Sequence, residues 1–78
     1  MNSPDDKPPD TSGRAAAFLS LVGERVRKAR ERRGISRNKL AELSRVSLRY
    51  LAQLESGSGN ISIALLWRIS EALDHRME

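Results

Sequence analysis

Residues Ser36 to Glu55 read S-R-N-K-L-A-E-L-S-R-V-S-L-R-Y-L-A-Q-L-E, and this stretch decides the fold of the 78-residue chain. It contains two short helical patterns, Arg37–Leu43 and Ser47–Leu54, which the three residues 44–46 join. In the first pattern Leu40 and Ala41 lie on one face, and in the second Leu51 and Leu54 stand three residues apart, one turn along the same face. Helices this short are not stable alone in water, so they must pack against each other and against further helices.

Longer helical patterns lie on both sides of this pair. Good helix formers run from Arg14 to Arg33, with apolar residues at spacings of four, four and three: Phe18, Val22, Val26 and Ala29. A loop, S-G-S-G-N, precedes a helical pattern at Ile63–Leu73, whose apolar face contains Leu66, Ile69 and Leu73. We therefore predict an all-α bundle of four helices, and the last residues, 75–78, would start a fifth. Trp67 is expected to pack against Phe18 or Leu19 and not to bind a ligand.

Small and polar residues mark the ends of these helices. Ser36, Ser47 and Ser62 stand where a side chain can cap the helix that follows. Gly34 follows a run of arginines and suits a left-handed helix end. Val46 should fill the turn between the two short helices, and Ala41 should be small because another helix crosses it closely. These positions predict a tight pair of helices with a fixed angle between them.

The N-terminal residues differ in composition from the rest. Residues 1–13 contain three prolines and three aspartates, so we predict a disordered arm there and one domain at 14–78. This acidic start is unlike a secretory leader, and no apolar run approaches the roughly 20 residues that span a bilayer. The chain has no cysteine. We therefore expect a cytoplasmic protein that does not enter a membrane.

Positive charge is concentrated around the helix pair. Residues 25–49 contain ten basic and two acidic residues, a local net charge of +8, while the segments on either side each carry −2 within a total of +4. Such a cluster indicates a polyanionic partner, although a solvated helix face would look similar. Two helices joined by a turn of three or four residues are also the unit of helix-turn-helix DNA-binding domains.

Residues 22–73 resemble a lambda-repressor-like helix-turn-helix domain of the Cro/C1 (xenobiotic-response-element) family. The resemblance rests on positions that fall in the register of the family pattern: Val22, Arg30, Gly34-Ile35-Ser36-Arg37, Leu40-Ala41, Arg45-Val46-Ser47, Leu54-Glu55-Ser56-Gly57 and Asn60-Ile61-Ser62. It implies a bundle of five helices that binds double-stranded DNA as a homodimer. The chain departs from the pattern at Arg37, which is usually Gln, at Arg45, which is usually Gly, and at Ile61, which is usually Pro.

The segment R-Y-L-A-Q-L-E-S-G-S-G-N-I-S-I also resembles the sequences of a narrower group, the regulators of benzoyl-CoA catabolism. In that group a shikimate-kinase-like domain follows the DNA-binding domain. This resemblance implies that the chain is a fragment of a longer regulator, expected to repress an aromatic-catabolism operon from an inverted repeat. An acyl-CoA effector would then bind the missing C-terminal domain.

The family resemblance implies a role for each of a set of residues. The residues expected to face DNA bases lie on the second short helix: Ser47, Leu48, Arg49, Tyr50 and Gln53. Arg49 suits guanine and Gln53 suits adenine, although Arg49 could contact a phosphate instead. The Tyr50 ring could also merely cover the helix pair. The residues expected near phosphates are Ser36, Arg37, Lys39, Arg45, Asn60 and Ser62; for Asn60 a loop-capping role is the alternative.

Arg30 and Glu55 are expected to form a structural ion pair. We expect no catalytic residues, no metal site and no cofactor, because the sequence has no nucleophile–base set and no phosphate-binding loop, and its lone His75 has no partner at ligand spacing. Two other binding functions remain open at this point. The chain could be an antitoxin-like autoregulator, or it could use its helix-turn-helix only for protein contacts.

Overall fold

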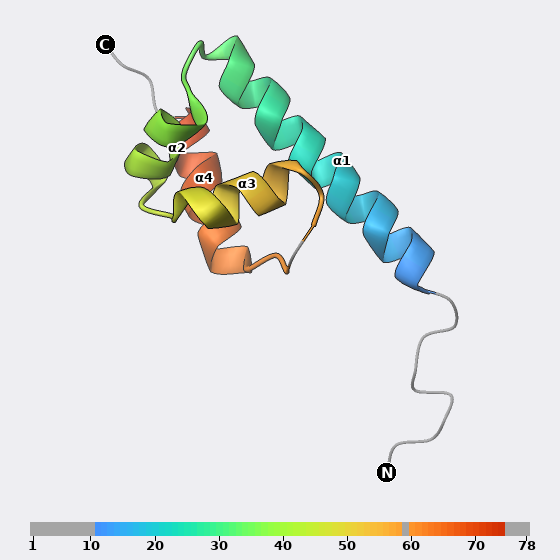
Figure 1. Cartoon of the computed structure of the whole chain (residues 1–78). Coiled ribbons are helices and arrows are strands. Elements are labelled where there is room, and N and C mark those ends of the chain that lie inside the picture. The colour runs from blue at the N-terminus through green and yellow to red at the C-terminus, as the bar shows by residue number, and fades with distance from the viewer. Residues whose placement is uncertain (1–10, 59, 75–78) are drawn as a thin grey trace.

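The computed structural model describes residues 11–58 and 60–74, and this part of the chain forms four α-helices (Figure 1). They are α1 (Thr11–Arg32), α2 (Arg37–Ser44), α3 (Leu48–Glu55) and α4 (Ile63–Asp74). The predicted all-α fold with its helix pair is confirmed. Helix α1 begins at Thr11 and so includes the last residues of the segment that we expected to be an arm. The rest of that arm and the expected start of a fifth helix lie outside the described residues.

The core lies where the helix pair meets its neighbours. Helix α3 packs against α1, while α2 packs against both α3 and α4. The buried apolar side chains come from all four helices and the turn: Val26, Leu40, Ala41, Val46, Leu51, Leu54 and Ile69. Ala41 and Val46, which we expected to give the pair its fixed angle, are both among them. The two short helices are therefore stabilised mainly by tertiary packing.

Two aromatic residues do not lie where the sequence pattern predicts. Phe18 is 61% exposed and Trp67 is 62% exposed, so neither belongs to the buried core. Helix α1 has 22 residues and α3 has eight, which correspond to lengths of roughly 33 and 12 Å. The short helix therefore covers only part of the long one, and α1 extends past it towards its N-terminal end (Figure 1). The expected packing of Trp67 against α1, and of Phe18 in a buried stripe, was wrong.

Serine hydroxyls cap the three later helices. The hydroxyls of Ser36 and Ser47 accept hydrogen bonds from the backbone N–H three residues further on, at 3.0 and 2.9 Å. The hydroxyl of Ser62 accepts one in the same way at 3.3 Å. These bonds satisfy N–H groups that have no partner within the helix, so each serine helps to set where its helix begins.

The turn between α2 and α3 depends on a left-handed residue. Arg45 has φ 61° and ψ 34°, and its N–H bonds to carbonyls of α2. Among the described residues, every other one with positive φ is a glycine. This conformation lets the chain reverse so that the next residue, Val46, enters the core. The turn therefore contains a strained side-chain-bearing residue at the position where the related pattern has glycine.

Substitution of Arg45 by glycine should stabilise the domain by about 0.5–1 kcal/mol. A left-handed residue with a Cβ costs about 1–2 kcal/mol, and the greater freedom of glycine in the unfolded chain offsets part of that gain. Urea denaturation should show a higher midpoint with an unchanged slope. As a control, Arg25→Gly on exposed α1 should destabilise by about 1 kcal/mol. A lower midpoint for Arg45→Gly would contradict the interpretation of strain.

Candidate nucleic-acid interface

Helix α3 presents one polar face to solvent and one apolar face to the core. Its exposed residues include Arg49, Gln53 and Leu48, which is 46% exposed, whereas Leu51 and Leu54 are buried. Ser47, the cap of this helix, is exposed as well. The structure thus brings four of the five residues that we expected to read bases onto one accessible helix. Side chains on such a face can reach base edges in a major groove.

Tyr50, the fifth of these residues, is half-buried and packs against the core. Its hydroxyl oxygen accepts a hydrogen bond from the backbone N–H of Ser62 at 3.0 Å. Tyr50 therefore connects α3 to the residue that caps α4. Because the hydroxyl hydrogen is not used in that bond, the group can still donate to an outside acceptor. The structure supports a bracing role for the side chain and leaves one donor for a phosphate.

A surface groove separates the start of α2 from the outer side of α3. Its lining residues are Ser36, Arg37, Asn38, Leu48, Arg49 and Ala52. Arg37, expected near phosphates, and Arg49, expected near bases, therefore lie around one groove although 12 positions separate them. Asn38 was not foreseen as part of this site. Its place beside Arg37 in the exposed first turn of α2 was the signal that could have revealed it.

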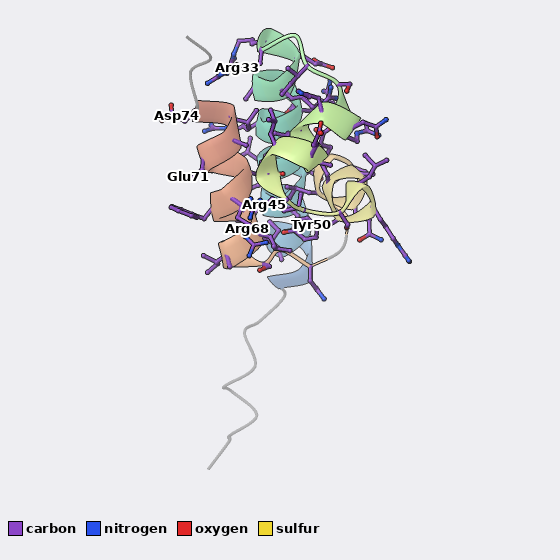
Figure 2. All side chains as sticks on the ribbon, turned by 90° about the vertical axis from the view of Figure 1, so that its left-hand side faces the viewer. Arg33, Arg45, Tyr50, Arg68, Glu71 and Asp74 are labelled. Atoms are coloured by element: carbon purple, nitrogen blue, oxygen red, sulfur yellow. The ribbon has the colours of Figure 1, made fainter. Side chains whose placement is uncertain are left out.

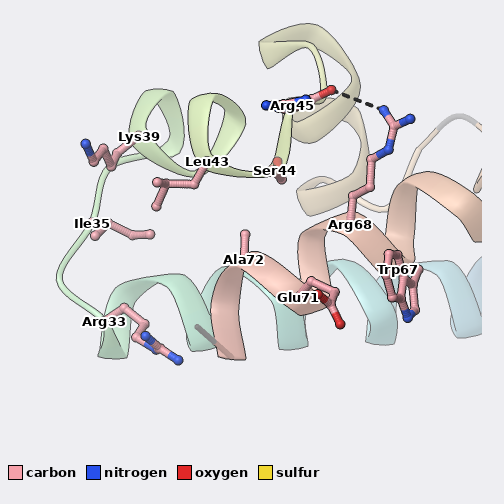
Figure 3. A pocket seen from close by; sticks show the side chains of 10 residues that line it. All are labelled: Arg33, Ile35, Lys39, Leu43, Ser44, Arg45, Trp67, Arg68, Glu71 and Ala72. Carbon is pink, nitrogen blue, oxygen red and sulfur yellow. Dashed lines mark hydrogen bonds between the residues drawn. The ribbon is translucent and has the colours of Figure 1, made fainter. Parts of the chain in front are cut away.

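Two other residues expected near phosphates lie elsewhere. Lys39 and Arg45 line a second groove, between α2 and α4, together with Arg68 of α4 (Figure 3). Arg68 Nη1 donates to the backbone carbonyl of Arg45 at 3.4 Å, and both residues lie on the same side of the molecule (Figure 2). Arg45 lies in the turn that leads into α3, and the acidic Glu71 of α4 also lines this second groove. Lys39 and Arg45 are thus separate from the groove that contains Arg37 and Arg49.

The remaining two expected phosphate residues precede α4. Asn60 is exposed. Ser62 is half-buried, and its hydroxyl accepts the capping bond from the Leu65 N–H while its own N–H donates to Tyr50. The Ser62 side chain is therefore occupied with local structure. At this end of α4 the exposed side chain of Asn60 is accessible to a ligand.

A buried carboxylate joins α3 to two other parts of the fold. Glu55, whose side chain is 2% exposed, accepts hydrogen bonds from Arg30 Nε at 2.8 Å and Arg30 Nη2 at 3.1 Å. Arg37 Nε also donates to Glu55, at 3.1 Å. The hydrogen bond from Arg30 to Glu55 raises the pKa of the Arg30 guanidinium. The Arg30–Glu55 pair is as we expected it, but Arg37 was not foreseen as a third member.

The described residues contain no group of three or more His, Cys, Asp or Glu side chains that could hold a metal ion. None of the helices in residues 11–58 and 60–74 has both the length and the apolar character needed to cross a membrane. Over the same residues, each buried side-chain nitrogen and oxygen has a hydrogen-bond partner. The polar groups available to a ligand are therefore those on the surface, where exposed basic side chains come from α1, α2, the turn and α3.

Comparisons with known proteins agree with this geometry. The profile of a family described as helix-turn-helix matches residues 26–76. The chain is 38% identical over 61 residues to an HTH-type transcriptional regulatory protein of Pyrococcus furiosus, and 42% identical over 52 residues to the HTH-type transcriptional regulator RamB of Mycobacterium tuberculosis. These alignments cover 78% and 67% of this chain but only 19% and 11% of the two relatives. No solved structure gives a significant match.

Proposed function

This chain belongs to the helix-turn-helix family of the Cro/C1 type, and from that premise we propose that it reads a specific operator sequence as the DNA-binding domain of a repressor. The observation that carries the proposal is the exposed face of α3, where Arg49 lines a positively charged groove and Gln53 is also exposed. Both side chains have the donor geometry that base edges in the major groove require. Domains of this kind bind and do not catalyse.

The proposed contacts divide into two classes. Arg49 donates to guanine O6 and N7, Gln53 pairs with adenine N6 and N7, and Leu48 with the Ser47 methylene touches thymine methyl groups. Tyr50 lies beside these base-contacting residues on α3. The contacts proposed for the DNA backbone come from the start of α2, the turn after it and the segment before α4: Ser36, Arg37, Lys39, Arg45, Asn60 and Ser62. The backbone contacts would position α3, and the base contacts would select the sequence.

The proposed operator is an inverted repeat bound by a homodimer. A single α3 of eight residues reads only a short half-site, so two copies about one DNA turn apart would supply the needed specificity. Because the chain spans at most a fifth of the relatives it matches, we expect further domains in the regulator. The likeness to benzoyl-CoA regulators supports an acyl-CoA effector there, control of an aromatic-catabolism operon, and action in the cytoplasm.

Substitution of Arg49 by alanine should weaken discrimination by about 1–3 kcal/mol at one base pair of the site. The test selects bound sequences from a random duplex library with the natural protein, and then measures the affinity of the variant for single-base changes in the selected site. Arg25→Ala on exposed α1 is the matched control and should leave base preference unchanged.

Two other results have separate meanings. Equal loss on every duplex would show that Arg49 contacts a phosphate instead of a base. If the natural protein selects no sequence from the library, the proposed sequence-specific function is wrong.

A further inference from the structure

Glu55 has an arrangement that a simple ion pair does not need. It is the last residue of α3, and its nearly inaccessible carboxylate accepts from two arginines on different segments. Arg30 occupies both carboxylate oxygens through Nε and Nη2. Arg37 adds a third bond through Nε to Oε1. One carboxylate therefore binds two guanidinium groups, and only one of these is needed to neutralise it.

The two arginines differ in what remains accessible. The Arg30 side chain is 12% exposed, and its Nη1 donates to the carbonyl of Ile35 at 3.0 Å, so every one of its nitrogens is used inside the protein. The Arg37 side chain is 44% exposed and, among the described residues, its one hydrogen bond is from Nε to Glu55. Its Nη1 and Nη2 keep four N–H donors for an outside group.

These free donors belong to the groove that also contains Arg49. A guanidinium held through Nε presents its two terminal nitrogens in one plane, which is the geometry that binds a phosphate with two parallel bonds. The anchor is rigid because Arg30 fixes Glu55 and also holds the loop before α2 through Ile35. A free arginine would lose conformational entropy when it binds, whereas a side chain held in place loses less.

We propose that Glu55 is a positioning residue for DNA binding, which orients the guanidinium of Arg37 towards a phosphate beside the bases read by Arg49. This inference rests on the proposed DNA-binding function and adds a role to a residue that otherwise only links helices. It explains why an arginine, and not merely a positive charge, stands at the start of α2. The terminal N–H donors of Arg37 are then already oriented in the folded protein before DNA binds.

Substitution of Arg37 by lysine separates charge from orientation. Lysine keeps the positive charge but cannot donate to Glu55 and present a planar pair of donors at the same time. We expect Arg37→Lys to bind both a selected and an unrelated duplex about three- to tenfold more weakly, with the salt dependence unchanged. Arg37→Gln should also lower the slope of log affinity against log salt by about 0.9. The control Arg25→Lys should bind like the natural protein.

Glu55→Gln tests the role of the carboxylate itself. Affinities are measured under conditions in which circular dichroism shows that this variant is folded. If Glu55 positions Arg37, then Arg37→Lys should cause no further loss of affinity in the Glu55→Gln protein, because neither side chain is held there. Equal losses in both backgrounds, or natural affinity for Arg37→Lys alone, would overturn the proposal.

A measurement on the natural protein without DNA does not depend on the stability of any variant. Hydrogen exchange of the Arg37 Nε–H, followed by NMR, should be at least tenfold slower than exchange of the Nε–H of exposed Arg25. The Arg37 proton is donated to the buried carboxylate of Glu55, which protects it from solvent. Equal exchange rates would overturn the inference. Failure of the natural protein to bind any duplex would instead overturn the proposed function, whatever this exchange experiment shows.

Discussion

Replacement of Gly23 by alanine is expected to destabilise the domain by about 3 kcal/mol, although alanine is the better helix former. A Cβ at this position of α1 would overlap the backbone carbonyl of Leu54 and lie 3.1 Å from the backbone of Glu55. These are backbone atoms at the end of α3, so no side chain can turn aside to make room. The two helices would have to separate, which would open the packing around Leu54.

Gly13→Ala is the matched control for this prediction. Gly13 also lies in α1, but nothing stands within 4 Å of the Cβ that alanine would add. Helix propensity alone then applies, and the substitution should stabilise by up to about 1 kcal/mol. Thermal or urea denaturation of both variants measures the difference. If Gly23→Ala is as stable as Gly13→Ala, the close approach of α1 and α3 is not a feature of the folded protein.

Replacement of Arg30 by methionine should destabilise the domain by about 3–5 kcal/mol. Glu55 would lose two of its three hydrogen bonds while its side chain stays buried. The remaining bond, from Arg37 at the surface, would compensate the buried charge less effectively than the bonds from Arg30 do. The loop before α2 would also lose the bond to Ile35. Because α1, α2 and α3 all meet at this carboxylate, we expect the loss to appear in global unfolding and not in one helix end.

An exposed ion pair on the same helix is the matched control. Arg27 and Glu31 lie 3.3 Å apart with side chains 40% and 53% exposed. Arg27→Met should therefore cost at most about 0.5 kcal/mol, because solvent screens such pairs. Urea midpoints of the two variants give the comparison. Similar small losses for both would mean that the Glu55 carboxylate is hydrated in solution and not buried.

Much of the fold follows from local chemistry that the sequence displays. The serine caps, the left-handed turn and the buried faces of the two short helices depend on residues close to one another in the chain. The exposed face of α3 follows for the same reason, since a helix that buries Leu51 and Leu54 must expose Arg49 and Gln53. The family pattern then supplied the role that we propose for that face.

Other features depend on contacts between residues that are far apart in the sequence, and these were not predicted. Phe18 and Leu21 continue an apolar pattern on α1, yet they are 61% and 45% exposed because the short helix beside them ends too soon. Gly23 looks like an ordinary weak point of a helix until the backbone of α3 is placed against it. Periodicity describes which side of a helix is apolar, but it does not give the length of the partner that covers it.

The helix pair at residues 36–55 has some features that its sequence determines and others that only tertiary packing determines. The sequence by itself determined its two helices, their caps, its buried face and the family to which it belongs, because all of these depend on neighbouring residues. Only the tertiary structure decided that Arg37 shares the carboxylate of Glu55 with Arg30 and borders the same groove as Arg49. Those partners lie 7 to 25 positions apart, and only the packing angle between helices brings their side chains within hydrogen-bonding distance.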